Sequence, residues 1–384
     1  MRPAGSVQFS RPSLPRHGWR RPLGGVVGAL TLLALAACAP TSGEDQAFDP
    51  RKTTNTDFTT RTVALGSRPI TMDVRNIDGD DSKDVAASNR FGNTVTVLTE
   101  GLTVSETLAV GQEPTDVLFG DFNGADDLDL AVLSEQGTRL TVFINTGASW
   151  SSGTDFDLAG VSTQVSLIDL DGGGGAQDLV VSVSGAGLMV AFVNDGDGNF
   201  TPVLTSTADG PQRFVVDHWD SGDFPDIAVI HPIEDIVSVL IGDGLGGFTV
   251  VPAGGLETKN NPADIATADF NGDGNPDFAL TNRFSDKVSV FRGDGSGGFT
   301  LLDEFDVKDS PTNIVAGAFT GDVAGSRDDL ATIHRSRRVI SVLLWNEEQQ
   351  RHQVFVHDVS RNPTGIAVGD FNADDLTDII TVEA

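Results

Sequence analysis

Cysteine is nearly absent from this sequence, and positive charge is scarce. One of the 384 residues is cysteine, and 25 Lys and Arg stand against 55 Asp and Glu, for a formal net charge of −30. A single cysteine excludes an intramolecular disulfide, so stability must come from core burial, sheet closure or metal. Nucleic acid is disfavoured as a partner, because phosphate backbones are bound by clustered Lys and Arg. The acidity suits a protein that holds divalent cations, and equally a soluble extracellular surface.

Helical periodicity and the common catalytic motifs are missing as well. No segment has a convincing helical pattern of apolar residues. The sequence contains no H-E-x-x-H motif and no G-x-S-x-G elbow, and no two of the histidines after residue 37 are four residues apart. We therefore assign no catalytic residues, and an enzymatic function is not favoured.

The first 37 residues have the layout of a secretory signal peptide. Residues 1–22 contain five Arg and no acidic residue, and an apolar run follows over 23–37. This run is too short and too Gly-rich for a comfortable membrane span. It leads into "LAAC", which resembles the lipobox of bacterial lipoproteins, and that resemblance implies cleavage before Cys38 and lipidation of Cys38. We expect an exported protein of the bacterial cell envelope, attached to a membrane through this lipid.

Three segments are expected from the N-terminus onward. A lipoprotein signal peptide covers 1–37, a flexible tether covers 38–57, and one folded domain covers 58–384. The tether is small, polar and aperiodic after the cysteine. Removal of 1–37 takes away five positive charges and no negative ones, which leaves a net charge of −35.

One short acidic stretch, "DFNGDGNPD" at 269–277, recurs along the chain in varied form. Seven copies each close on an aspartate, at steps of 45 to 52 residues: Asp84, Asp129, Asp178, Asp226, Asp277, Asp329 and Asp378. An apolar segment such as "DFALT" follows each closing Asp, then an alternating one such as "VSVFR", a Gly-rich turn and a more polar segment. Period-2 alternation between Gly, Asp and Asn clusters predicts four antiparallel strands per repeat.

Seven such sheets bury their faces by stacking around an axis. The predicted fold is therefore an all-β, seven-bladed β-propeller of four-stranded antiparallel blades. The last repeat supplies two strands, while 60–67 has the pattern of a fourth strand with no repeat before it. We expect this N-terminal strand to close the last blade, whose third strand is either missing or supplied by 41–57.

The repeats resemble FG-GAP/VCBS-type repeats, the family that includes the seven-bladed propeller of integrin α chains. The resemblance covers 60–384. It implies that the loop between the first and second strands of a blade binds calcium.

The 269–277 loop carries the strongest calcium pattern. Oxygen-bearing side chains alternate along it, and glycines allow it to wrap around a hard cation. It is not an EF-hand, because Leu280 stands where that motif requires Glu. The alternative is an Asx-turn without metal, but three converging carboxylates repel one another unless a cation is present. The candidate ligands are Asp269, Asn271, Asp273, Asn275 and Asp277.

The other copies preserve the pattern to different degrees. Two keep all four side-chain positions: Asn76, Asp78, Asp80 and Asp84 in the first, and Asp370, Asn372, Asp374 and Asp378 in the last. Two keep three, and for these calcium and a bare turn stay open: Asp121, Asn123 and Asp129 in the second copy, and Asp169, Asp171 and Asp178 in the third. The copies beginning at His218 and Ala318 are expected to be turns without metal. We expect several calcium ions with a structural role.

The turns between second and third strands form a candidate ligand face. Its exposed basic and aromatic residues are Arg90, Phe91, Arg283, Phe284, Arg335 and Arg337. These side chains suit a glycan or an acidic peptide, and the alternative is a recurrent turn whose Phe covers a blade edge. The expected function is binding or adhesion through a glycan or protein ligand at the cell surface. A carbohydrate-active enzyme of the lyase kind and an envelope scaffold stay open.

Overall fold

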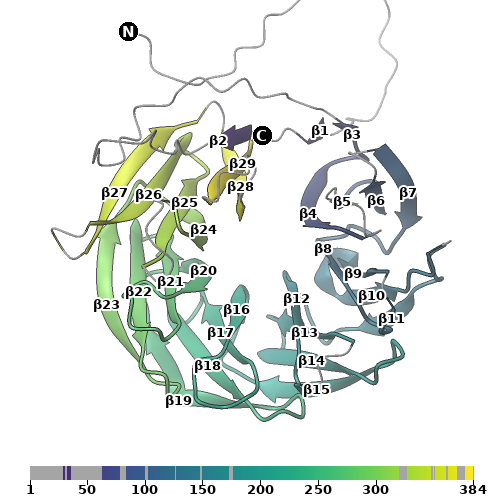
Figure 1. Ribbon diagram of the computed structural model, residues 1–384, viewed down its shortest axis with the longest axis horizontal. Helices are drawn as coiled ribbons and strands as arrows, with labels where there is room; N and C mark the ends of the chain where they lie inside the picture. Colours follow the sequence, from purple (N-terminus) through teal and green to yellow (C-terminus); the bar gives the residue numbers. More distant parts are fainter. Residues whose placement is uncertain are drawn as a thin grey trace, which may run out of the picture.

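The computed structural model of this protein is a ring of antiparallel sheets around a central axis (Figure 1). It describes residues 29–30, 33–35, 63–77, 84–99, 103–125, 127–147, 149–172, 176–319, 327–346, 349, 351–359, 362–369 and 377–383. Apart from one short 3-10 helix, η1 (Glu135–Gly137), all regular structure in these residues is strand. No helix in them is long and apolar enough to cross a membrane. The prediction of an all-β propeller is confirmed.

Six sheets have four strands each, and in each the strands neighbour one another in chain order. The first three sheets contain β4 (Pro69–Arg75), β5 (Asp84–Asn89), β6 (Thr94–Thr99) and β7 (Thr103–Ala109); β8 (Asp116–Gly120), β9 (Asp129–Ser134), β10 (Arg139–Phe143) and β11 (Thr154–Asp157); and β12 (Val165–Ile168), β13 (Asp178–Val183), β14 (Leu188–Asn194) and β15 (Phe200–Ser206). The next three contain β16 (Phe214–Asp217), β17 (Asp226–His231), β18 (Ile236–Gly242) and β19 (Phe248–Glu257); β20 (Pro262–Ala268), β21 (Asp277–Asn282), β22 (Lys287–Gly293) and β23 (Phe299–Asp306); and β24 (Pro311–Gly317), β25 (Asp329–His334), β26 (Val339–Asn346) and β27 (Arg351–Asp358).

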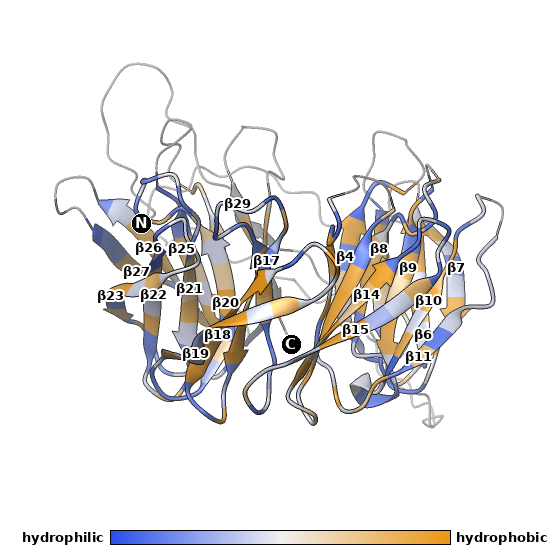
Figure 2. Cartoon of the chain, turned by 90° about the horizontal axis from the view of Figure 1, so that it is seen from below, coloured by the Kyte–Doolittle hydropathy of each residue, from blue (hydrophilic) through white to orange (hydrophobic). Residues whose placement is uncertain are grey.

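Burial changes across each sheet from the axis outward. The first strands, such as β12, β16 and β20, surround the axis, and the fourth strands lie at the rim (Figure 1). The second strand of all six sheets is buried along its whole length, because neighbours flank it within the sheet and adjacent sheets cover both faces. Apolar residues accordingly lie along the strands and polar residues in the loops at the two ends of the ring (Figure 2).

The core is divided into wedges between consecutive sheets. Among the described residues, six clusters of buried apolar side chains each join two consecutive sheets, and a seventh lies on the first sheet together with Leu65. One of them packs Phe278 and Leu280 of β21 against Trp219 and Val239 from the preceding repeat. Each fully buried side chain of this size contributes about 1.5–3 kcal/mol, so the sheets stabilise one another and not themselves alone.

The closing sheet differs from the expectation. It contains β28 (Pro363–Gly369), β29 (Asp378–Glu383) and β2 (Leu33–Leu35). The predicted strand at 60–67 appears as β3 (Val63–Ala64), but it pairs with β1 (Ala29–Leu30) and not with β29. The strand beside β29 therefore comes from the apolar run expected to be a signal peptide, because that run supplies backbone groups to an otherwise unpaired edge. A four-stranded seventh blade stays a prediction, and the tether at 38–57 lies outside the described residues.

Candidate functional site

Every repeat places its closing aspartate at the first residue of its second strand, as in Asp226 of β17. Asp226 is fully buried, and its two carboxylate oxygens have different partners. Oδ2 accepts the backbone N–H of Trp219 in the preceding loop at 2.8 Å, and Oδ1 accepts that of Gly242 at 2.9 Å. One side chain thus holds the loop between first and second strands against the end of the third strand.

The same pair of bonds recurs around the ring. In five repeats Oδ1 accepts an N–H 16 residues later at 2.7–2.9 Å: the pairs are Asp129–Asn145, Asp178–Asn194, Asp226–Gly242, Asp277–Gly293 and Asp329–Trp345. In six repeats Oδ2 accepts an N–H from the preceding loop: the pairs are Asp84–Ile77, Asp129–Phe122, Asp178–Leu170, Asp226–Trp219, Asp277–Phe270 and Asp329–Phe319. Glycine at 242 and 293 suits this close approach, since an added Cβ would meet a proline carbonyl oxygen at 2.4 Å and 2.3 Å.

Burial makes these carboxylates costly to ionise. It raises the pKa of Asp129 and of Asp277 to about 6, although the two backbone bonds in each case favour the charged form. Neighbouring loop carboxylates add to the effect, Asp269 and Asp273 in the case of Asp277. The pKa values of Asp178 and Asp226 are raised by burial as well. Each loop therefore accumulates negative charge that a proton or a cation can relieve.

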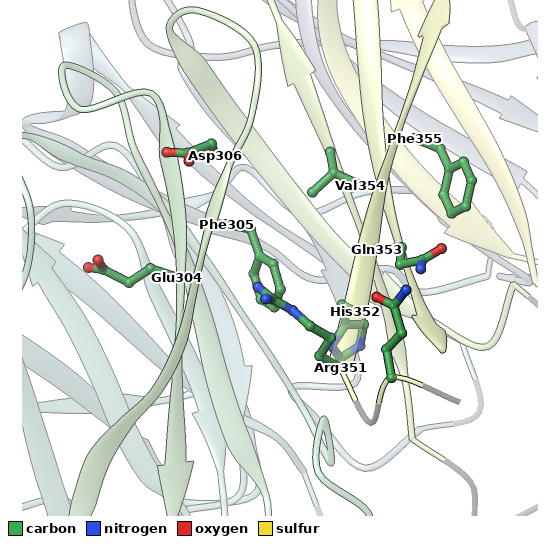
Figure 3. A pocket seen from close by; sticks show the side chains of 9 residues that line it. Glu304, Phe305, Asp306, Arg351, His352, Gln353, Val354 and Phe355 are labelled. Atoms are coloured by element: carbon green, nitrogen blue, oxygen red, sulfur yellow. The ribbon is translucent and has the colours of Figure 1, made fainter. Parts of the chain in front are cut away.

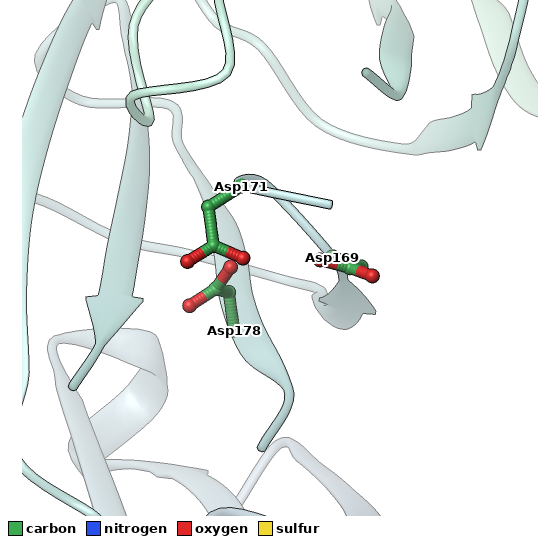
Figure 4. Close-up of side chains that lie close together, drawn as sticks. All are labelled: Asp169, Asp171 and Asp178. Carbon is green, nitrogen blue, oxygen red and sulfur yellow. The ribbon is translucent and has the colours of Figure 1, made fainter. Parts of the chain in front are cut away.

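The third repeat brings three of its candidate ligands together. One oxygen from each of Asp169, Asp171 and Asp178 lies within 4.8 Å of the others (Figure 4). Asp178 is buried, whereas Asp169 and Asp171 are exposed. Hard carboxylate oxygens are the ligands that calcium prefers, so this donor set fits the ion. It is the one group of three acidic or histidine ligands among the described residues.

The 269–277 loop has another arrangement, although its sequence pattern is stronger. Asp269 accepts backbone N–H groups of Gly272 at 2.6 Å and Gly274 at 2.8 Å. The side-chain amide of Asn271 donates to Asp277 at 2.9 Å. These contacts are those of the Asx-turn alternative, and the carboxylates of this loop do not form a group of three. Calcium in this loop stays a prediction.

The other candidate ligands are described in part. In the second repeat, Asp121 accepts the N–H of Gly124 and Asn123 that of Ala125, both at 2.8 Å. In the first repeat Asn76 lies beside the loop that Asp84 closes. The remaining candidates, Asp78, Asp80, Asp370, Asn372, Asp374 and Cys38, lie outside the described residues, and for Asp378 the structure describes the backbone alone.

The candidate ligand face is formed by turns at one end of the ring. Phe91 is 60% exposed and Phe284 67% exposed, so neither covers a blade edge as the alternative expected. Arg68 lies over the Phe91 ring at 4.9 Å and Arg283 over that of Phe284 at 5.6 Å. Ile233, which sequence analysis did not select, occupies the corresponding turn of the fourth repeat and is 76% exposed.

Acidic side chains partly neutralise the arginines of this face. Arg90 forms an ion pair with Glu113 at 2.9 Å, and Arg337 forms one with Asp309. Arg335 lies exposed in the turn between β25 and β26. The turns therefore present aromatic and apolar groups beside arginines whose charge is partly neutralised. Such a surface would attract an acidic partner moderately.

A pocket of about 390 Å³ lies at the rim, between the fourth strands β23 and β27 (Figure 3). Arg351 lies over Phe305 at 5.5 Å, and His352 is buried between Phe305 and Trp345. Burial lowers the pKa of His352, which favours a neutral packing role. No motif indicated this pocket, because its walls come from two different repeats.

Comparison with known proteins agrees with this architecture. Residues 219–280 match the model of the FG-GAP-like repeat. BBS1N, solved in complex with ARL6DN, has a TM-score of 0.58 at 14% identity, covering 83% of this chain and 93% of that chain. A functionally unknown protein from Desulfotomaculum acetoxidans has a TM-score of 0.52 at 13% identity, and the match covers 73% of this chain and 81% of that chain. The virginiamycin B lyase of Staphylococcus aureus has a TM-score of 0.50 at 12% identity, and the match covers 82% of this chain and 99% of that chain.

The curated proteins contain no match to this sequence. The solved structures share the fold at identities too low to transfer an activity. The ring of sheets and its repeated loops define a β-propeller. More specifically, residues 219–280 of this β-propeller match the FG-GAP-like repeat.

The closing aspartate can be tested in the fourth repeat, where no calcium is expected. We expect Asp226→Asn to lower the free energy of unfolding by about 2–3 kcal/mol, because the amide leaves a buried N–H without its acceptor. The matched control is Asp306→Asn, since Asp306 is 88% exposed in its ion pair and should change stability by less than about 1 kcal/mol. Urea unfolding in the presence of chelator measures both, and equal effects would contradict the structural role.

Proposed function

We propose that this protein is a calcium-stabilised binding module of the bacterial cell envelope that recognises a glycan or protein partner. The observation that carries the proposal is the set of exposed apolar side chains at corresponding turns of three repeats: Phe91, Ile233 and Phe284. Exposed aromatic and apolar groups gathered on one face are typical of interaction sites. The adjoining arginines favour an acidic partner, either an acidic polysaccharide or an acidic peptide segment.

Calcium fits the third repeat on chemical grounds. Asp169, Asp171 and Asp178 would hold the ion, and the ion would supply positive charge where three carboxylates now repel one another. Asp178 also binds Leu170 and Asn194 through its two oxygens, so an ion there would reinforce the join between loop and third strand. The role proposed for calcium is therefore structural.

Anchoring through Cys38 is proposed from the lipobox-like sequence. Cleavage before Cys38 would remove β1 and β2, which lie at 29–30 and 33–35. The edge of β29 would then need another strand. Lipid anchoring and the pairing of β2 with β29 are thus mutually exclusive states of the chain.

We expect calcium to raise the melting temperature by several degrees over chelator. A calcium concentration 100 times the Kd adds about 2.7 kcal/mol to the free energy of unfolding. Asp171→Asn should remove most of the rise in melting temperature, while Asp197→Asn, in an exposed turn of the same sheet, should preserve it.

The calcium effect should also depend on pH. Burial raises the pKa of Asp178 in the folded state, so the metal-free protein gains stability from its protonation at low pH and loses that stability as the pH rises through the folded pKa. Because calcium binds the ionised carboxylate, the rise in melting temperature that calcium causes should be small near about pH 4 and complete near about pH 7. A protein shown to be metal-free that gains nothing from calcium would contradict the proposal.

The ligand face can be tested on glycan and acidic-peptide arrays with the calcium-loaded protein. We expect binding to acidic members, reduced at least about tenfold by the double substitution of Phe91 and Phe284 to Ser, since these rings supply contact area. Leu301→Ser is the control, because Leu301 is 50% exposed on the rim strand β23. Binding that survives the double substitution would place the partner elsewhere.

The N-terminus of the protein isolated from its native membrane tests the anchor. We expect a mass that begins at acylated Cys38, and Cys38→Ser should move the protein from the detergent phase to the aqueous phase. Intact residues 29–35 in the isolated protein would instead support the β2–β29 pairing and reject the anchor.

A further inference from the structure

A series of equivalent residues near the start of each first strand surrounds the axis. Its members are Thr71, Asp116, Gln164, Arg213, Asp264, Asn313 and Gly365. Three of them join consecutive blades by accepting a backbone N–H from the next first strand. Asp116 accepts from Val165 at 3.1 Å, Gln164 from Phe214 at 3.0 Å, and Asp264 from Ile314 at 3.1 Å.

Arg213 interrupts this series. A guanidinium carries donors and no acceptor, so Arg213 cannot take the N–H of Ile265 as its counterparts would. Within the part of the chain that the structure describes, its side chain has no hydrogen bond or ion pair, although it is partly buried. A partly buried donor set without partners is unfavourable, and nothing in the blade-joining pattern accounts for it.

Two carboxylates lie within the electrostatic range of Arg213, although neither is close enough for an ion pair. Asp116 comes from the second repeat and Asp264 from the fifth. Burial raises the pKa of both, to about 6 for Asp116, and Arg213 acts on both in the opposite direction. Among the described residues, the axis therefore combines one guanidinium without an ion pair and two acidic acceptors, and all three side chains are partly buried.

These groups lie at the same end of the ring as the candidate ligand face. Glu113, which pairs with Arg90 of that face, is three residues before Asp116. A molecule that reaches the turns can therefore also approach the axis. Asp116 lies in β8 and Asp264 in β20, and Arg213 directly precedes β16; these three inner strands all border the centre (Figure 1).

We propose that Arg213, Asp116 and Asp264 form an axial binding site for a small carboxylate that carries neighbouring hydroxyl or amino donors. The planar fork of Arg213 matches a carboxylate through two parallel hydrogen bonds. Asp116 and Asp264 accept from the neighbouring donors. Oδ2 of Asp116 holds one N–H and keeps a second acceptor site, whereas Oδ2 of Asp264 already accepts from Ile314 and from the Asn313 amide, so Asp264 offers its other oxygen. Sugar acids and amino acids share this chemistry. The site does not depend on the partner proposed for the turns.

The test is calorimetric titration of the calcium-loaded protein with four probes. Glucuronate and alanine each carry a carboxylate with neighbouring hydroxyl or amino donors. Acetate carries the carboxylate alone, and glucose carries the hydroxyl donors alone. We expect glucuronate or alanine to bind at least tenfold more tightly than acetate and glucose. Whichever of the two binds identifies the source as a sugar acid or an amino acid. Failure of both, or equal binding of acetate, overturns the proposal.

Substitution of Arg213 separates binding from stability. Arg213→Gln should weaken binding at least tenfold, and Arg213→Lys, which keeps the charge and loses the fork, at least threefold. Both variants should keep the melting temperature within a few degrees, because Arg213 joins no blades. The double Ser substitution at Phe91 and Phe284 should leave this titration unchanged, so the axial site and the proposed face can fail separately. Unchanged binding in both Arg213 variants overturns the assignment.

Discussion

The buried carboxylate of the closing aspartate is the interaction on which the rest of the ring depends. One oxygen holds the loop after the first strand, and the other holds the end of the third strand, as Asp226 does with Trp219 and Gly242. In a dry interior such bonds are strong when complete and costly when one partner is lost. Because the bond to the third strand recurs at a constant 16-residue separation in five repeats, it holds the start of the second strand and the end of the third strand in the same arrangement in each of them.

That same buried carboxylate is costly to ionise, and its charge must be stabilised by groups in the loop. Burial opposes its ionisation, and loop aspartates nearby oppose it further. Two repeats differ in how they surround this carboxylate. In the third, Asp169 and Asp171 gather around Asp178 and add to the negative charge that a cation would relieve. In the fifth, Asp269 accepts backbone N–H groups while Asn271 donates to Asp277. Gly272 and Gly274 make this possible, since both have positive φ, at 75° and 84°. Similar sequences therefore give a convergent acid group in one loop and a self-bonded turn in the other.

Stacked sheets also explain where ligand contacts can arise. The second strands are wholly buried and the wedges between sheets are apolar, so polar chemistry is confined to the axis, the rim and the two ends. At one end, turns of equal length present Phe91, Ile233 and Phe284 to solvent. At the axis, residues near the start of the first strands join blades, as Asp264 does, or, like Arg213, have no side-chain hydrogen bond or ion pair to any described residue. One scaffold thus serves both binding surfaces.

The sequence by itself determined the repeat, the four-strand unit and the start of each second strand at its closing Asp, because strand alternation and turn residues are local signals. It could not show that Asp169, Asp171 and Asp178 converge while the stronger 269–277 pattern does not, since that depends on which backbone groups each side chain reaches. It also could not show the strand beside β29, the rim pocket or the placement of Asp116, Arg213 and Asp264 around one axis. Those three residues are separated by whole repeats, and only the arrangement of the sheets around that axis places them on its inner side.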